Sequence, residues 1–584
     1  MQPGASRKHR RKTTFSRPPR RRTSRPTDPT KTPRDVQDVS LIIPAFNEAD
    51  GLRQSLPGMI RWPEVKEVIV IANGCTDNTA NVASRAGAKV LNFPMRLGHD
   101  TGRAIGAKAA TGNYILFLDG DIAWQRKDIL PFVRALRRGA DVALNRYPAP
   151  ADKTYDHPTA IAKRALNLAM YHPEWKASSL TAVPHGIRRS ALARIGCEAL
   201  AVPPLALAKA SVAGLKIVRP HYVNVGLRNR WSRRYGPGYS TQNLILGDHV
   251  QALAYLLSVR GWRGGFMDGT RARQFLQTVT QADTGEEFSV PSHDKQPNIA
   301  TAGLANIANV EARTLHASAD PFESKPEEEA KNPLGPVAVI PAHNERRTLP
   351  AVLRQVRKMK LEKILVVENG SNDGTQRMIG EGRVDVLHFK QPLGHDVGRA
   401  ILAKTLMHHS CTLFVDADIP ISYRSLIPFR DSVLHRGTDV AVNRLGQGLP
   451  LCRRRDAVST MKTFLNIALG RPKLGLASLT AVPHALSQKA LQTIPGEELA
   501  VPPKAYARAV LSGLTVRPVK YVDVIRQNRR RPQLHRGQVH SRMSRMIIGD
   551  HLEAVELLIQ KRGIRGGFEQ PRRLDVLHHP DKWL

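Results

Sequence analysis

Two pairs of closely spaced carboxylates give this sequence its clearest capacity for chemistry. Asp119 and Asp121 flank a glycine directly after an apolar run, and Asp416 and Asp418 repeat this arrangement around an alanine. Such hard oxygen ligands suit Mg²⁺ or Mn²⁺, and the ion can bridge a protein to a diphosphate and offset the charge of a departing diphosphate. One Asp-x-Asp alone is often a solvated turn. Two of them, each between an apolar strand and an isoleucine, favour a metal site.

The elements that must position the first pair follow an alternating pattern. Strands are predicted over Val39–Ile43, Val65–Ala72, Lys89–Phe93 and Tyr114–Leu118, with helices from Ala49, over Thr79–Gly87 and over Gly102–Ala110. This alternation predicts an α/β fold with a mostly parallel sheet covered by helices on both faces. Ligands of such sheets bind beyond the carboxyl ends of the strands. Asn47-Glu48, Asn73-Gly74 and the first Asp-x-Asp all follow strand ends, so we expect one crevice to collect them.

The whole pattern occurs twice. Ile43–Glu48 returns at Ile340–Glu345, Leu97–Ala104 at Leu393–Ala400 and Ser179–His185 at Ser478–His484, at offsets of 297, 296 and 299 residues. A fixed order at this spacing indicates a duplicated domain, and 584 residues exceed what one core normally supports. We therefore predict two Rossmann-like domains in tandem. The predicted organisation is a disordered basic tail (1–35), a first domain (36–266), an acidic flexible linker (267–333), a second domain (334–570) and a C-terminal tail (571–584).

The net charge of +38 arises from 88 Lys and Arg against 50 Asp and Glu, which suits an anionic partner. The composition, with 41% hydrophobic and 24% charged residues, excludes wholesale disorder, and 5% aromatic residues argue against extensive base stacking. No apolar run is long enough to span a membrane and no C-x-x-C pair occurs, which predicts a cytoplasmic protein. The basic tail suits peripheral contact with an anionic membrane or a cell-wall polymer, although a merely solvated tail explains it as well.

These motifs together resemble the family 2 glycosyltransferases, which have the GT-A fold and use nucleotide-diphosphate sugars. Both halves carry Pro-x-x-Asn-Glu after the first strand, N-G-x-x-D-x-T after the second, G-x-x-x-G-R-A at a helix start, and Asp-x-Asp. The resemblance implies a UDP- or GDP-sugar donor and makes Asp121 and Asp418 the principal metal ligands, with Asp119 and Asp416 beside ribose or metal. It places further substrate-binding residues near the nucleotide: Asn47, Glu48, Asn73 and Asp77 in the first half, and Asn344, Glu345, Asn369 and Asp373 in the second.

Two further pairs of repeated residues are candidates for the same crevice. Arg103 and Arg399 follow a glycine at a helix start, a good place to meet phosphate, although a solvated helix residue is an equal alternative. His185 and His484 each follow Val-Pro, a context that predicts exposure. They are candidates to complete the metal shell, against the more common structural role of a lone histidine.

The general base, if the reaction inverts the sugar configuration, has two candidates in each half. Glu198 and Glu497 precede Ala-Val-Pro-Pro segments where we expect the acceptor side. Asp248 and Asp550 are the competing candidates. Their alternative role is to cap helices that begin at Val250 and Leu552.

The predicted function is therefore metal-dependent transfer of a sugar to an acceptor hydroxyl, in cell-wall, extracellular polysaccharide or glycoconjugate synthesis. A catalytically inert protein that binds sugar nucleotides remains an alternative. A nucleic-acid-binding protein would use the positive charge but gives two Asp-x-Asp sites no purpose. A sugar-phosphate nucleotidylyltransferase should open with a Gly-rich phosphate loop, where this chain has Pro-Ala-Phe-Asn-Glu.

Overall fold

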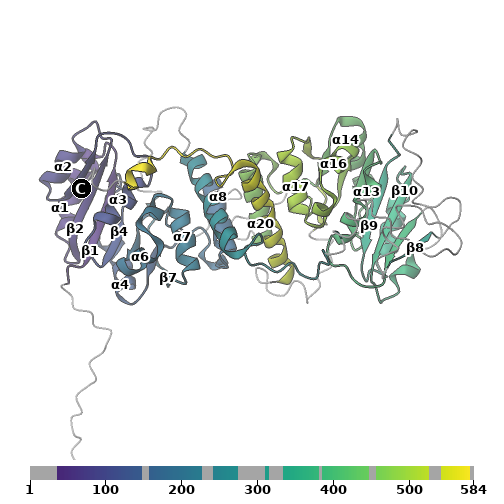
Figure 1. The fold of residues 1–584 in the computed structure, drawn as a ribbon, viewed down its shortest axis with the longest axis horizontal. Coiled ribbons are helices and arrows are strands. Elements are labelled where there is room, and N and C mark those ends of the chain that lie inside the picture. Colours follow the sequence, from purple (N-terminus) through teal and green to yellow (C-terminus); the bar gives the residue numbers. More distant parts are fainter. Residues whose placement is uncertain are drawn as a thin grey trace, which may run out of the picture.

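The computed structural model describes residues 36–147, 157–225, 241–273, 276, 310–314, 333–379, 384–445, 456–524 and 541–578. Two α/β domains lie at opposite ends of an elongated molecule (Figure 1). The long helices α8 (Thr241–Arg260) and α20 (Arg542–Arg562) pack against each other between them. The predicted basic tail lies outside the described residues.

The first domain contains a seven-stranded sheet in the order β3-β2-β1-β4-β6-β5-β7. Neighbouring strands in this sheet are parallel, except that β6 runs antiparallel to β4 and β5. The strands are β1 (Val39–Ala45), β2 (Val65–Asn73), β3 (Lys89–Phe93), β4 (Tyr114–Phe117), β5 (Val142–Asn145), β6 (His185–Arg188) and β7 (Ile217–His221). The predicted mostly parallel sheet is confirmed.

The second domain repeats this sheet and adds an edge strand, in the order β15-β13-β14-β12-β9-β10-β11-β8. Its strands are β8 (Val310–Thr314), β9 (Val337–Ala342), β10 (Lys363–Asn369), β11 (Asp385–Phe389), β12 (Cys411–Phe414), β13 (Val440–Val442), β14 (His484–Ser487) and β15 (Val516–Pro518). The edge strand β8 pairs antiparallel with β11 and falls inside the stretch predicted as a flexible linker. That stretch is therefore structured where its backbone completes the sheet.

Helices cover the sheets as the sequence predicts. In the first domain they are α1 (Ala49–Ile60), α2 (Thr79–Arg85), α3 (Thr101–Ala109), α4 (Arg126–Arg137), α5 (Pro158–Ala169), α6 (Arg189–Ile195), α7 (Pro203–Val212) and α8. In the second they are α11 (Leu349–Val356), α12 (Val397–Ile401), α13 (Ala403–Leu406), α14 (Tyr423–Arg436), α15 (Ala457–Ala468), α16 (Gln488–Thr493), α17 (Pro502–Leu511) and α20. The short 3₁₀ helices are η1 (Pro173–Trp175), η2 (Cys197–Ala201), η5 (Thr375–Met378), η7 (Pro472–Leu474), η8 (Gly496–Ala500) and η9 (Leu574–His578).

The pattern of buried residues explains these elements. Leu41, Ile42 and Ile43 on β1 are all fully buried, as expected for a parallel strand covered on both faces. In α1, Leu52, Leu56 and Met59 are buried at helical spacing and form the stripe that packs on the sheet. The strand ends thus meet at one edge, followed by the turns that carry the candidate residues.

One hydrophobic core joins the two domains. A single cluster of buried residues extends from Ile42 and Ile105 in the first domain, through Leu253 on α8 and Leu552 on α20, to Val397 in the second. The opposite face of each sheet has its own separate cluster. In the part of the chain that the structure describes, every helix is too short or too polar to cross a membrane.

Candidate active sites

Each Asp-x-Asp motif lies at the carboxyl edge of its sheet, directly after the strand that pairs with the first strand of the domain. Leu118 extends β4 by donating from its backbone N–H to the carbonyl of Ile42 at 3.0 Å, so Asp119 leaves the sheet beside the end of β1. The middle position packs against the β1–α1 turn at ordinary contact distance. A Cβ atom on Gly120 would lie 3.4 Å from the Cβ of Ala45 and 3.5 Å from the side chain of Glu48. The motif is thereby packed against the β1–α1 turn, as expected for one crevice.

Arg103 is built into the site rather than exposed to a ligand. Its guanidinium, 4% exposed, donates to Asp119 Oδ1 at 3.1 Å and pairs with Asp100 Oδ1 at 2.9 Å. Burial lowers the pKa of Arg103, but the two carboxylates outweigh that effect and the pKa is raised. The alternative of a solvated helix residue is wrong. Arg103 is the group that fixes the orientation of the first acid.

The second domain repeats this chain of contacts. Arg399 donates to Asp416 Oδ1 at 2.7 Å and pairs with Asp396 Oδ1 at 3.0 Å. Asp119 and Asp416 remain about one-third exposed, at 37% and 36%. Among the contacts of the described residues, Oδ1 is the carboxylate oxygen of each acid that meets the arginine.

The two turns beside the first motif hold each other. The amide of Asn47, at a positive φ of 54°, accepts from the backbone N–H of Thr76 at 2.8 Å and donates to its hydroxyl at 3.0 Å. Asp77 accepts from Thr79 and from the backbone N–H of Ala49 at the start of α1. Burial raises the pKa of Asp77, but the hydrogen bonds outweigh burial, so the pKa lies below its usual value. Glu48 donates its backbone N–H to the Thr79 hydroxyl at 2.8 Å.

Asn73 is also engaged by backbone. Its amide donates to the carbonyl of Gly98 at 3.0 Å and accepts from the N–H of Leu97 at 2.6 Å, and Asn369 repeats both contacts with Gly394 and Leu393. The remaining predicted residues of the second domain occupy equivalent positions: Asn344 accepts from Asn372, Glu345 donates its N–H to Thr375, and Asp373 accepts from Arg346 and Thr375. These hydrogen bonds hold the turns beside both Asp-x-Asp motifs in equivalent conformations.

The predicted exposure of His185 and His484 is wrong. Both rings are buried, and each stacks on a phenylalanine of the strand that precedes the motif, His185 on Phe117 with ring centroids 4.8 Å apart. From Nδ1, His185 donates to the carbonyl of Ala182 and His484 to the carbonyl of Ala481. Burial lowers the pKa of each ring to about 3. The prediction failed because β6 and β14 run between two other strands, which covers residues that Val-Pro seemed to expose.

The structure disfavours Glu198 and Glu497 as general bases. Both are exposed and belong to the short helices η2 and η8. Cys197, the neighbour of Glu198, lies within electrostatic reach of Lys108 and Arg189. Arg189 donates to the carbonyls of Ala110 and Gly112, which precede β4. Glu198 is therefore near the amino edge of the sheet, whereas Asp119 is at the carboxyl edge.

Asp248 and Asp550 also have the wrong surroundings for a base. Both side chains are buried, inside helices that begin at Thr241 and Arg542, so the predicted helix caps at Val250 and Leu552 are wrong as well. Asp248 pairs with Arg565 at 2.8 Å and with Arg572 at 2.6 Å. Asp550 pairs likewise with Arg263 at 2.9 Å and with Arg271 at 2.6 Å, so the arginines already occupy both carboxylates.

Sequence reasoning did not consider one repeated pair of lysines, Lys163 and Lys462. Lys163 on α5 lies within electrostatic reach of Arg103 and Asp100, and its ammonium is 6.0 Å from the Tyr147 ring centroid. Burial, then Arg103, lowers its pKa to about 8, and burial has the same effect on Lys462 on α15. The signal was available, because Lys163 and Lys462 repeat at 299 residues, the offset of the Ser179–His185 block.

Two buried histidines, on which the charges of these lysines act, predict a pH dependence of stability. His249 and His551 donate from Nδ1 to the carbonyls of Ile245 and Ile547, and burial lowers both pKa values to about 4. Between pH 6.5 and 4 each ring is protonated when unfolded and neutral when folded, so the native state is expected to lose stability as pH falls through this window. Denaturant unfolding at steps from pH 7.5 to 4.5 measures it.

The matched variants are His249→Gln and His551→Gln, which cannot take up a proton. Each should remove about one proton from the slope of unfolding free energy against pH. A slope that both variants leave unchanged would contradict this assignment.

With the geometry in place, comparison with known proteins shows a similarity in each domain to one family. Residues 40–196 and 337–445 both match the family model described as glycosyl transferase family 2. Each domain therefore contains a segment that is similar to this family. The two matched segments contain β1 to β4 with the first Asp-x-Asp, and β9 to β12 with the second.

The curated relatives that match are named as glycosyltransferases. The uncharacterized glycosyltransferase Rv0539 of Mycobacterium tuberculosis is 32% identical over 108 residues, which cover 18% of this chain and 48% of the relative. Glycosyltransferase AglD of Haloferax volcanii is 27% identical over 143 residues, 22% of this chain and 23% of the relative. The chain thus spans half or less of the length of these relatives.

Solved structures with similar domains include two sugar-phosphoglycerate synthases. Glucosyl-3-phosphoglycerate synthase from Mycobacterium tuberculosis, in complex with Mn²⁺, uridine diphosphate and glucosyl-3-phosphoglycerate, is 18% identical with a TM-score of 0.28, covering 38% of this chain and 79% of that chain. Mannosyl-3-phosphoglycerate synthase from Rubrobacter xylanophilus is 18% identical with a TM-score of 0.30, covering 38% and 75%.

Proposed function

We propose that this chain transfers a sugar from a nucleotide-diphosphate sugar to an acceptor hydroxyl, at one site in each family 2 domain. The observation that carries the proposal is the repeated arrangement of Asp-x-Asp at the carboxyl edge of both sheets, with the first acid held by a buried arginine. The proposal is supported by the general rule that open α/β sheets bind ligands at this edge. Equivalent contacts in both domains support two working sites.

The donor set fits a divalent cation, Mg²⁺ or Mn²⁺. Asp119 and Asp121 would hold it in the first site, and Asp416 and Asp418 in the second, because partly exposed carboxylates supply the hard oxygen ligands these ions prefer. When bound, the ion supplies positive charge against the diphosphate. His185 and His484 remain candidate third ligands, since Nε2 of His185 has no hydrogen-bond partner within the described residues.

The other residues prepare the site for the donor. Arg103 and Arg399 keep one acid of each motif in place, and the Asn47–Thr76 contact fixes the turn on which we expect the nucleotide to lie. Lys163 and Lys462 are the cations that we assign to the diphosphate oxygens, because Lys163 lies beside the Arg103–Asp100 pair and Lys462 repeats it. A partly deprotonated lysine would gain its proton as the anionic donor binds.

Nucleotide release from a panel of UDP- and GDP-sugars, with Mn²⁺, with Mg²⁺ and without metal, tests the proposal. We expect metal-dependent release from at least one donor and none from the Asp121→Ala/Asp418→Ala double variant. Equal release by the wild type and the double variant for every donor would overturn it. Donor binding by calorimetry without release would favour the inert sugar-nucleotide-binding alternative.

A further inference from the structure

The segments that follow the two long helices are exchanged between the domains. We define the first strap as residues 261–273, after α8, and the second strap as residues 563–573, after α20. The first strap packs on α20 and on the second domain, whereas the second strap packs on α8 and returns to α3 of the first domain, as the yellow end of the chain shows (Figure 1). The first strap was predicted to lie partly in the flexible linker and the second partly in the C-terminal tail. In the structure, buried ion pairs hold both straps.

The second strap places one arginine against the first domain. Arg572 is fully buried and pairs with both oxygens of Asp248, at 2.9 and 2.6 Å. It also donates from Nε to the carbonyl of His99 at 2.5 Å and lies 3.4 Å from Asp100 Oδ2. The next residue, Arg573, donates its backbone N–H to the carbonyl of Leu97 at 2.9 Å.

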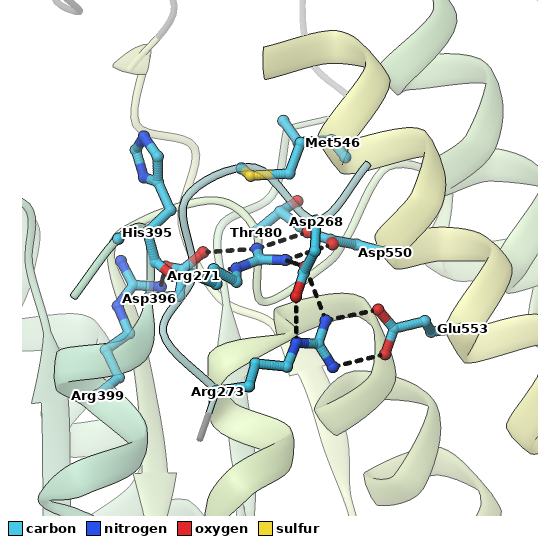
Figure 2. A network of polar contacts seen from close by, with 12 residues as sticks. Asp268, Arg271, Arg273, His395, Asp396, Arg399, Thr480, Met546, Asp550 and Glu553 are labelled. Atoms are coloured by element: carbon cyan, nitrogen blue, oxygen red, sulfur yellow. Dashed lines mark hydrogen bonds and ion pairs between the residues drawn. The ribbon is translucent and has the colours of Figure 1, made fainter. Parts of the chain in front are cut away.

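The first strap makes the same contacts with the second domain. Arg271 is fully buried and donates to both oxygens of Asp550, at 2.6 and 2.8 Å, and to the carbonyl of His395 at 3.0 Å (Figure 2). Its Nη2 lies 3.6 Å from Asp396 Oδ2. The backbone N–H of Ala272 completes the match by donating to the carbonyl of Leu393 at 2.8 Å.

Each strap approaches a loop that leaves no room for a side chain. A Cβ atom on Gly98 would lie 3.0 Å from the Cα of Arg572, and one on Gly394 would lie 2.5 Å from the carbonyl oxygen of Thr270. Both glycines have φ close to +90°, which other residues rarely adopt. The close fit makes each strap a wall of the loop that precedes α3 or α12.

Acidic groups around the first strap are matched by guanidinium groups. Asp268, Asp550 and Glu553 lie close enough together to resemble a metal site. Arg263, Arg271 and Arg273 pair with them, as the close-up shows for Arg271 and Arg273 (Figure 2). Three cations already balance three anions, so this cluster needs no metal ion.

The straps connect to the metal-binding motifs through one further arginine. Arg572 contacts Asp100, Asp100 pairs with Arg103, and Arg103 holds Asp119 of the first motif. Arg271 contacts Asp396, and the same sequence of contacts leads through Arg399 to Asp416. Each chain of contacts begins in one domain and ends at the site of the other.

We propose that Arg572 and Arg271 are positioning residues, each for the active site of the opposite domain. The second strap orders the His99–Asp100 loop and keeps Arg103 on Asp119, and the first strap does the same for Asp396, Arg399 and Asp416. The two domains therefore form one catalytic unit in which neither site is complete alone. This inference rests on the proposed function for its kinetic effect, and it also predicts a structural effect that needs no activity.

The kinetic test uses full-length chains with a single working site. In an Asp418→Ala background only the first site remains, and Arg572→Met should lower its kcat/KM for the sugar nucleotide by roughly 10- to 100-fold, since small misplacements at reacting groups have effects of this size. In an Asp121→Ala background the same substitution should change the second site less than about twofold. Arg271→Met should show the reverse selectivity. Arg572→Lys, which keeps the charge but not the forked contacts, should have an intermediate effect and is the variant to use if Arg572→Met does not fold.

The matched control is Arg573→Met, because Arg573 is the neighbouring residue with a side chain 42% exposed. It should leave both sites unchanged. Equal losses at both sites from Arg572→Met, measured well below its melting temperature, would reduce Arg572 to a general structural role and overturn the proposal. No loss at the first site would overturn it as well.

Hydrogen exchange separates this inference from the proposed function. Arg572→Met should speed the exchange of backbone amides in residues 97–109 by roughly tenfold and leave residues 393–406 unchanged, and Arg271→Met should do the opposite. If the enzyme releases no nucleotide, the proposed function fails, and this domain-crossed pattern still decides whether the straps order the opposite site. Exchange that changes equally in both segments, or in neither, would contradict the coupling.

Discussion

An Asp121→Ala variant is expected to lose nucleotide release at the first site by at least roughly 100-fold while the second site continues at its wild-type rate. The reason is that Asp121 belongs to a motif at the carboxyl edge of β4, where its carboxylate would hold the ion that faces the diphosphate. Asp418→Ala should give the complementary result, because the second motif follows β12 in the same way. Initial rates of the two single variants and the double variant, at saturating metal, measure the contribution of each site.

Asp50→Ala is the matched control, because Asp50 is an exposed acid on α1 close in sequence to the first site, with a side chain 89% exposed. Its loss should leave both sites unaffected. Full activity in both Asp-x-Asp single variants would contradict the assignment of the motifs. A total loss in one single variant and none in the other would instead mean that one domain does all the catalysis.

An Asp550→Asn variant is expected to lose about 3–5 kcal/mol of stability, the size usual when one partner of a buried ion pair is removed. Asp550 is buried and pairs with Arg263 at 2.9 Å and with Arg271 at 2.6 Å. Its neutralisation removes the negative charge that these two buried guanidinium groups share. Burial raises the pKa of Asp550, but the two arginines outweigh burial and lower it. Urea unfolding, followed by far-UV circular dichroism, measures the change in free energy.

Asp575→Asn serves as the control, because this acid pairs with Arg573 at the surface, where the two side chains are 59% and 42% exposed. Removing an exposed pair should change stability by less than about 1 kcal/mol. If Asp550 were instead the general base, Asp550→Asn would lower kcat strongly and leave stability intact. That outcome would restore the role predicted from the sequence.

Local sequence patterns predicted the elements that carry the sites. The apolar β-branched runs of β1 and β2 ended where the structure ends them, near Pro44 and at Asn73-Gly74, because strand pairing and turn chemistry act over a few residues. The Asp-x-Asp pairs were found by their chemistry and their repetition. Their placement at one edge then followed from the parallel sheet.

The contacts that fix these motifs were beyond local patterns. Asp248 meets Arg572, 324 residues away, so nothing near Asp248 indicated that it was paired. Glu198 was placed by its neighbouring prolines on an acceptor side, whereas η2 packs on α3 toward the amino edge of the sheet. Tertiary packing decided both cases.

One longer-range signal was present and was not used. Arg263-Gly264-Gly265-Phe266 returns as Arg565-Gly566-Gly567-Phe568, 302 residues later. In the structure, Arg263 and Arg565 make equivalent contacts with Asp550 and Asp248 across the domain boundary. The internal comparison that located the candidate sites would therefore also have located the straps, had it been extended into the segments predicted as linker and tail.

Calorimetric titration of the chain with UDP and with GDP in the presence of Mn²⁺ tests the central claim most directly, because it counts metal-dependent nucleotide sites without requiring an acceptor. The account predicts that one of these nucleotides binds with two sites per wild-type chain, one site in Asp121→Ala or Asp418→Ala, and none in the double variant. Unchanged stoichiometry and affinity in the double variant, or no binding of either nucleotide to the wild type, would contradict it.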